Sequence, residues 1–145
     1  MKASLLYRIT GVLLALFAAA HTLGFSQTDP QWGLDEMLRA MRSIHFDALG
    51  TQRTYWDFFM GAGVIVGVQY LFAAILSWLL GGLPDDVLAR MRAIAWSFAL
   101  CFAVITILSW AYLFIIPISF SAVITACLIV AAALIPKATP AKSGG

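Results

Sequence analysis

The sequence predicts an all-α, polytopic membrane protein: a bundle of four transmembrane helices with one short amphipathic helix in the first outer loop. Two observations lead to this fold class. Of the 145 residues, 62% are hydrophobic and 11% are charged, and the mean hydropathy is +0.92, which is more apolar surface than a soluble domain of this size could bury. Four apolar stretches are also each long enough to cross a hydrocarbon core of about 30 Å as a helix.

We expect one domain over residues 1–136, because a single bundle uses this whole length. The amphipathic helix covers about residues 30–45, residues 137–145 form a flexible tail, and the four spans cover about residues 4–25, 55–80, 88–116 and 118–135. The first stretch imitates a secretory signal peptide at Ala18–Ala20. Because Arg8 lies late for the charged region of such a peptide, we interpret the stretch as a retained span.

Basic residues predict the orientation of the spans. Four spans place both termini on one side, and the bias of Lys and Arg toward the cytoplasm predicts that this side is cytoplasmic. The six basic residues on the side of the termini are Lys2, Arg8, Arg90, Arg92, Lys137 and Lys142, and the three on the other side are Arg39, Arg42 and Arg53.

The connection after the first span contains the pattern of an amphipathic helix. Asp29-Pro30 is typical of an N-cap followed by proline in the first turn. Apolar residues then recur at helical spacing, namely Leu34, Met37, Leu38, Met41 and Ile44. We expect this helix either to anchor on the membrane surface or to cover the mouth of the bundle as a lid.

Turn and cap signals separate the remaining elements. Gly50 and Thr51 end the amphipathic helix, and Thr54-x-x-Asp57 predicts a capping box that opens the second span. The stretch Gly81–Pro84 predicts a tight inner turn, and Pro117 separates the third span from the fourth.

Polar side chains inside the membrane are functional candidates, because each needs a partner or a wet cavity. Several fall within about two turns of the predicted outer surface. A neutral imidazole there would coordinate metal or haem, or exchange protons. The alternatives stay open: Asp57 serves only as a cap, His21 reaches the headgroup zone, and His45 is solvated. The predicted outer-side polar cluster comprises His21, His45, Arg53, Asp57, Ser109 and Tyr112.

A second candidate position lies near the middle of the second span. Gln69 follows Gly63-x-x-x-Gly67, a spacing that lets another helix approach closely. Its carboxamide needs a partner such as the hydroxyl of Thr106 or Ser97. We expect these residues either to pack helices together or to contact a ligand.

The sequence does not support several classes of function. The net charge is only +2 and the basic residues form no run, so nucleic-acid binding is not indicated. Cys101 and Cys127 form no C-x-x-C pair, so neither thiol oxidation nor a zinc site is indicated. No residue is singled out as catalytic, and the sequence identifies no metal.

Two family resemblances can be stated. Arg8-Ile9-Thr10-Gly11 followed by His21 resembles the opening of succinate dehydrogenase membrane-anchor subunits, which bind haem b and quinone. The stretches His21–Phe25 and Arg53–Phe58 resemble those of a group of small uncharacterised four-helix bacterial inner-membrane proteins, loosely similar to DoxX-like proteins. The second resemblance covers most of the chain. It implies a four-helix architecture in the bacterial inner membrane and no catalytic residue.

Two functional hypotheses follow. The first is a protein without catalysis of its own, a binding or accessory protein or a subunit of a larger membrane complex. Its partners would be the lipid bilayer and other membrane proteins, or a second copy of itself. The second is a redox membrane protein. In it His21 would bind haem b, a metal or a quinone, and Asp57 would orient the imidazole or accept a proton.

Overall fold

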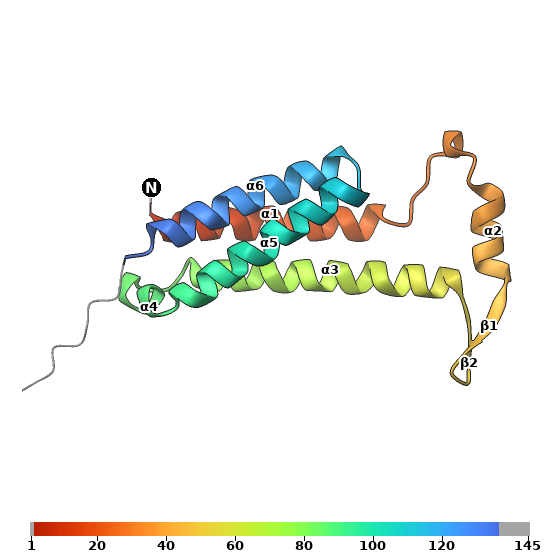
Figure 1. Cartoon of the computed structure of the whole chain (residues 1–145), viewed down its shortest axis with the longest axis horizontal. Helices are drawn as coiled ribbons and strands as arrows, with labels where there is room; N and C mark the ends of the chain where they lie inside the picture. Colours follow the sequence, from red (N-terminus) through yellow and green to blue (C-terminus); the bar gives the residue numbers. More distant parts are fainter. Residues whose placement is uncertain (1, 137–145) are drawn as a thin grey trace, which may run out of the picture. The chain divides into compact units, whose positions relative to one another are not determined.

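The computed structural model describes residues 2–136 (Figure 1). Its elements in chain order are α1 (Ala3–Gly24), the 3₁₀ helix η1 (Pro30–Trp32), α2 (Asp35–Ser43), β1 (His45–Ala48), β2 (Thr51–Thr54), α3 (Tyr55–Leu80), α4 (Asp85–Arg90), α5 (Arg92–Tyr112) and α6 (Ile115–Leu134). Four of the helices, α1, α3, α5 and α6, are long and apolar enough to cross a membrane. The predicted all-α class with four spans is therefore confirmed, and the protein is a multi-pass membrane protein. The predicted tail lies outside the described residues.

The chain forms two compact units. The first combines the residues up to Ala15 with those from Phe72 onward, and the second is Leu16–Leu71. The boundary crosses α1 and α3, so each of these helices contributes to both units. The single domain that the sequence suggests stays a prediction.

In the first unit, α1 packs closely against the second half of α3. The hydroxyl of Ser77 donates a buried hydrogen bond of 2.7 Å to the carbonyl oxygen of Tyr7. One turn further along α1, a Cβ placed on Gly11 would lie 3.1 Å from the carbonyl oxygen of Ala74. Small residues on both helices therefore let the two backbones approach each other.

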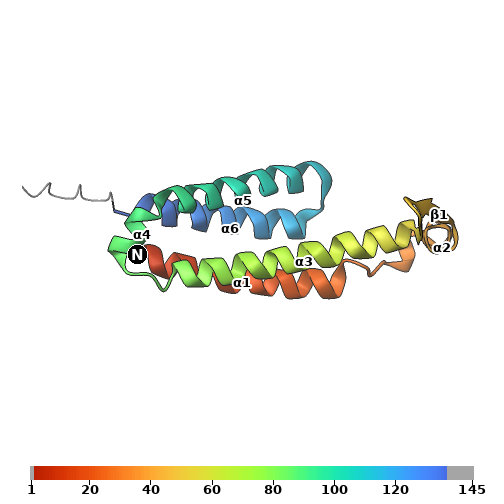
Figure 2. The same cartoon turned by 90° about the horizontal axis from the view of Figure 1, so that it is seen from below.

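The start of α1 also contacts the turn that follows α3 (Figure 2). The Nε of Arg8 donates to the carbonyl oxygen of Gly81 at 3.3 Å, and its guanidinium carbon lies 5.6 Å from the ring centre of Trp78. A Cβ on Gly81 would lie 2.8 Å from the carbonyl oxygen of Ser4. Glycine is required here by the close approach of two backbones.

Helices α5 and α6 run side by side in the first unit (Figures 1 and 2). The hydroxyls of Thr106 and Thr125 lie 2.9 Å apart in a hydrogen bond across the pair. The Nη1 of Arg92 donates to the carbonyl oxygen of Ile135 at 2.8 Å, where α6 ends and its carbonyls lack helical partners. The large fully buried side chains of this unit are Tyr7, Leu14, Leu80, Leu88, Ile124, Leu128 and Ile135.

Two predicted boundaries differ from the structure. The third span is not one helix over residues 88–116, because Met91 lies between α4 and α5 and α5 ends at Tyr112. Pro117 does not separate the last two spans, because α6 begins at Ile115 and Pro117 lies in its first turn. Proline is tolerated there since the N–H groups of a first turn have no helical acceptor.

In the second unit, the Asp29-Pro30 cap opens a 3₁₀ turn and not the amphipathic helix itself. The Asp29 carboxylate accepts from the N–H of Gln31 at 2.9 Å, and Gly33, at φ 64°, ends the turn in the left-handed conformation. Helix α2 then begins at Asp35. It is shorter than the predicted range of residues 30–45, because Gly33 interrupts that range.

A β-hairpin that the sequence analysis did not predict joins α2 to α3. Strands β1 and β2 pair antiparallel, with His45 opposite Thr54. Leu49 and Gly50 form the two-residue connection at φ 54° and 86°, as a type I′ turn requires. The side chain of Leu49 is fully exposed.

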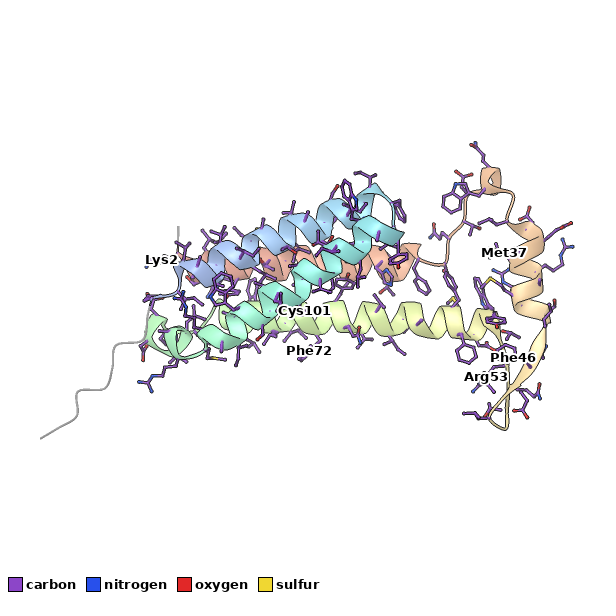
Figure 3. All side chains as sticks on the ribbon, viewed as in Figure 1. Lys2, Met37, Phe46, Arg53, Phe72 and Cys101 are labelled. Atoms are coloured by element: carbon purple, nitrogen blue, oxygen red, sulfur yellow. The ribbon has the colours of Figure 1, made fainter. Side chains whose placement is uncertain are left out.

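Aromatic contacts join α2 and the hairpin to the start of α3. The guanidinium of Arg42, on α2, lies over the ring of Trp56. The ring of Phe46, at the junction of hairpin and helix in Figure 3, lies 5.0 Å from that of Tyr55 and 5.8 Å from that of Phe58. These contacts hold the amphipathic helix next to the point where the second span begins.

Candidate functional site

The candidate site is built around His21, near the end of α1. Its Nε2 lies 2.9 Å from the carbonyl oxygen of Gly63 on α3. A carbonyl oxygen can only accept, so Nε2 must carry the proton of this hydrogen bond. Of the two nitrogens in a neutral ring, Nδ1 is then the one with a lone pair.

Aromatic rings surround the imidazole of His21. Phe17, one turn earlier on α1, and Phe25, the residue after the end of α1, stack on it with ring centres at 6.3 Å and 5.3 Å. Tyr70, from α3, lies at 6.3 Å. The half-buried imidazole is therefore fixed both by a hydrogen bond and by flat apolar surfaces.

The Gly63-x-x-x-Gly67 spacing provides room for this arrangement. A Cβ on Gly63 would overlap the Phe25 ring, and one on Gly67 would lie 2.6 Å from the Oγ1 of Thr22. Both glycines thus face α1 within the same chain. The hydroxyl of Thr22 meanwhile donates to the carbonyl of Ala18 at 2.8 Å.

Asp57 forms the predicted capping box with Thr54. The carboxylate accepts from the N–H of Thr54 at 2.8 Å, and the N–H of Asp57 donates to the Thr54 hydroxyl oxygen at 3.2 Å. The hydroxyl itself donates to the same carboxylate at 3.0 Å. Each of the two side chains thus satisfies one N–H group at the start of α3: the carboxylate accepts from the cap residue, and the Thr54 hydroxyl oxygen accepts from the first turn.

The two remaining candidates from the outer connection lie on the hairpin. The Nδ1 of His45 lies 3.0 Å from the carbonyl oxygen of Ser43, and its register partner is Thr54, so it is close to the capping box. Arg53 faces Phe46 in the register, its Nη1 donates to the carbonyl oxygen of Gln52 at 3.5 Å, and its positive charge acts on the Asp57 carboxylate. Both residues are exposed.

Ser109 and Tyr112 belong to the first unit, whereas the other four members of the predicted cluster belong to the second. Ser109 is buried, and Tyr112, the last residue of α5, is 81% exposed. Whether all six residues share one site stays a prediction. Among residues 2–136, no three His, Cys, Asp or Glu side chains gather closely enough to hold a metal ion.

Gln69 belongs to the second unit, whereas the two hydroxyls expected to pair with it, those of Thr106 and Ser97, belong to the first, so this pairing stays a prediction. Its side chain is exposed, and within the described part of the chain its carboxamide forms no hydrogen bond. The Thr106 hydroxyl is bonded to Phe102 and Thr125, and Ser97 is exposed. A polar group at this depth thus faces outward from α3.

The aromatic rings around His21 were missed by the sequence analysis. The signal was present, because Phe17, His21 and Phe25 are spaced by four residues and so lie on one face of a helix. The contribution of Tyr70 has no such signal, since it depends on how α3 packs against α1.

The chain matches no protein-family model, no curated protein and no solved structure.

Proposed function

We propose that this chain is a membrane protein without catalysis of its own that acts as a binding or accessory subunit of a larger membrane complex. The observation that carries the proposal is the use of the ionisable groups in the spans. His21 donates to a backbone carbonyl, Asp57 caps a helix, and Arg8 donates to the turn after α3. Each of these groups is engaged in holding helices in place.

Several hydroxyls of the spans have the same role, although those of Tyr7 and Thr10 are buried without a hydrogen-bond partner within the described residues. Ser77 and Thr106 bond across helix pairs. Thr22, Ser119 and Ser121 donate to carbonyls within their own helices, as hydroxyls in membrane helices commonly do. A chain that uses these polar groups to pack its helices is suited to present apolar helix faces to lipid and to neighbouring membrane proteins.

In this proposal both termini face the cytoplasm, as the distribution of Lys and Arg predicts, and the membrane is a bacterial inner membrane. The likeness to DoxX-like four-helix proteins agrees with an accessory role, because some of those proteins accompany quinone-linked oxidoreductases. The segment of residues 26–54 would then be on the outer side.

The test is extraction of the tagged full chain with its surrounding lipid, followed by native mass spectrometry. We expect particles that contain at least one other membrane protein in fixed ratio, absent from a matched tagged four-helix control protein. Particles whose protein mass is only a multiple of 15.7 kDa would contradict the proposal.

A second candidate function, a redox protein that uses haem, a metal or a quinone, is favoured by the geometry of His21. Histidines that bind metals commonly donate their other N–H to a carbonyl or carboxylate, which fixes the ring. Here Nε2 is fixed in this way, so Nδ1 would be the ligand or would accept a hydrogen bond from a quinol. Because Nδ1 is the ring nitrogen nearer to the backbone, it suits the small hydroxyl of a quinol better than the wide ring of a haem.

An absorption spectrum and lipid extraction of the purified chain distinguish the two candidates. The substitution His21→Gln keeps a donor for the Gly63 carbonyl but removes the imidazole. A haem band, bound metal or bound quinone that disappears in this variant would support the redox function. A colourless protein that is free of metal and of quinone would exclude it.

A further inference from the structure

Several helix ends meet at one side of the first unit, and this side is basic. The start of α1, the end of α3, the whole of α4, the start of α5 and the end of α6 lie together there in both views (Figures 1 and 2). Lys2, at the start of α1, is labelled in Figure 3. Within the described residues this side carries four cationic side chains and two carboxylates, namely those of Lys2, Arg8, Arg90, Arg92, Asp85 and Asp86. We call these six residues the basic end.

Three contacts hold the side chain of Arg8 in one position. Its Nε donates to the carbonyl oxygen of Gly81, and its guanidinium lies against the ring of Trp78. Its stem lies close to the turn, since a Cβ on Gly81 would come within 2.8 Å of the Arg8 Cγ. A guanidinium has five N–H groups in one plane, and within the described residues only the one on Nε is bonded. The four on Nη1 and Nη2 remain free, on a side chain that is exposed.

None of the seven side-chain carboxylates of the chain pairs with Arg8 in the described structure. Five of them belong to residues 29–57, at or beyond the opposite ends of α1 and α3. These helices are about 33 Å and about 39 Å long, so two transmembrane spans separate these carboxylates from Arg8. Asp85 and Asp86 share the basic end, but neither forms an ion pair with Arg8 within the described residues. The carbonyl end of α3 supplies only about half a negative charge, so Arg8 keeps a positive charge without a full counter-charge.

Arg8 lies at the level where two spans leave the bilayer. It is five residues after Ala3, the start of α1, or about 8 Å along the helix axis, and it contacts Gly81, the first residue after α3. Trp78, in the last turn of α3, is 53% exposed, and a tryptophan at the end of a span is typical of the membrane interface. The anions that a membrane supplies at this level are lipid phosphates. A planar guanidinium can donate to two oxygens of one phosphate.

We infer that Arg8 and Trp78 form a binding site for the headgroup phosphate of an anionic phospholipid. Nη1 and Nη2 of Arg8 donate to two phosphate oxygens, and the indole ring lies where the acyl chains begin. An anionic lipid is preferred over a zwitterionic one, because the other cations of the basic end repel a headgroup ammonium. A lipid fits better than a soluble phosphate, because exposed apolar residues adjoin the site. Leu5 and Ile75, each one turn away along its helix, offer surface for acyl chains.

This inference does not depend on the proposed function. An accessory subunit and a redox protein could each hold a lipid at the basic end. The two proposals also have different readouts, since the lipid site is tested by bound phospholipid and the accessory role by other proteins.

Native mass spectrometry of the full chain in detergent micelles tests the site. Titration with dioleoylphosphatidylglycerol or dioleoylphosphatidylcholine measures the affinity for the first bound lipid, and we expect the anionic lipid to bind about five-fold more tightly or better. Arg8→Gln should weaken binding of the anionic lipid by about ten-fold or more, because hydrogen bonds to a charged group are lost. Arg90→Gln is the matched control. It removes the same charge from the same end, at a side chain without a hydrogen bond or ion pair in the described residues, and should change the affinity little.

A change at Trp78 tests the site without removal of the arginine. Trp78→Leu keeps Arg8 and its hydrogen bond to Gly81 but releases the plane of the guanidinium. We expect it to weaken binding of the anionic lipid by about two- to five-fold, the effect of an exposed cation–π contact. Trp96→Leu, at an exposed tryptophan on α5, is the control and should have little effect. Circular dichroism and thermal unfolding establish that each variant is folded.

Three results would each overturn the inference. One is equal affinity for the anionic and the zwitterionic lipid. Another is an equal effect of Arg8→Gln and Arg90→Gln, which would mean that only the total charge matters. The third is inorganic phosphate that displaces the anionic lipid at equal concentration, since the ligand would then be a soluble anion. If loss of the bond to Gly81 prevents Arg8→Gln from folding, equal effects of Trp78→Leu and Trp96→Leu would overturn the inference instead.

Discussion

The guanidinium carbon of Arg42, in the last turn of α2, lies 4.1 Å from the ring centre of Trp56, in the first turn of α3. A cation over an indole ring is attracted by the negative face of the ring. This contact connects the amphipathic helix directly to a transmembrane span.

We predict that Arg42→Gln loosens α2. Loss of an exposed cation–π contact, about 0.5–1 kcal/mol, should speed amide hydrogen exchange in α2 by about two- to five-fold. Arg39→Gln, a change on the same helix, is the control and should have little effect. Equal rates of amide exchange in α2 of the Arg42→Gln and Arg39→Gln variants would show that the contact between Arg42 and Trp56 does not hold this helix in place.

Removal of the capping hydroxyl should destabilise the chain. Thr54→Ala removes the acceptor of the Asp57 N–H and a donor to its carboxylate, and we expect a loss of about 1 kcal/mol in the free energy of unfolding in mixed micelles. Thr54→Ser should restore most of it. Thr51→Ala, at an exposed strand position, serves as the control. A loss of the same size at Thr51 would argue against a specific cap.

Gly81 and Gly82, the two glycines after α3, should differ sharply in how well they tolerate replacement by alanine. A Cβ on Gly81 would lie 2.8 Å from the backbone oxygen of Ser4, whereas one on Gly82 would be no closer than 3.4 Å to the carbonyl of Leu79. We therefore expect Gly81→Ala to cost about 1–3 kcal/mol of unfolding free energy through overpacking, and Gly82→Ala little. Similar losses for both would mean that α1 can move away from the turn.

Replacement of the residue at the hairpin tip should stabilise the hairpin. Leu49 has φ 54°, a conformation that costs most residues about 1–2 kcal/mol and that Asn adopts more readily. We expect Leu49→Asn to slow amide exchange in β1 and β2. Leu49→Ala removes the apolar side chain without relief of the backbone and should not slow it. Faster exchange in both variants would indicate that the exposed leucine is covered by lipid or protein.

Much of the fold could be predicted because it follows from local properties of the sequence. The hydropathy of the sequence located the spans. The spacing of Thr54 and Asp57 was enough to predict the cap at the start of α3. The hairpin was missed because its turn is Leu49-Gly50, which lacks the usual Asn or Asp before glycine. Gly33 likewise shortens a helix whose apolar pattern continues on both sides of it.

The candidate site could be predicted only in part, because a sequence gives the depth of a residue but not the direction in which it faces. The depth of Gln69 was clear, yet α3 is apolar all round, so its exposed face could not be identified. The same limit applied to His21, whose bond to Gly63 depends on the rotation of two helices. The alternative that Asp57 serves as a cap is confirmed by its hydrogen bonds.

Strand β2 ends at Thr54 and α3 begins at Tyr55, so no slack separates the outer hairpin from the span. A torque applied to the hairpin, for example by a bound antibody fragment, would therefore turn the first turn of the span with it. Any rotation of the hairpin is in this way transmitted directly to the start of α3.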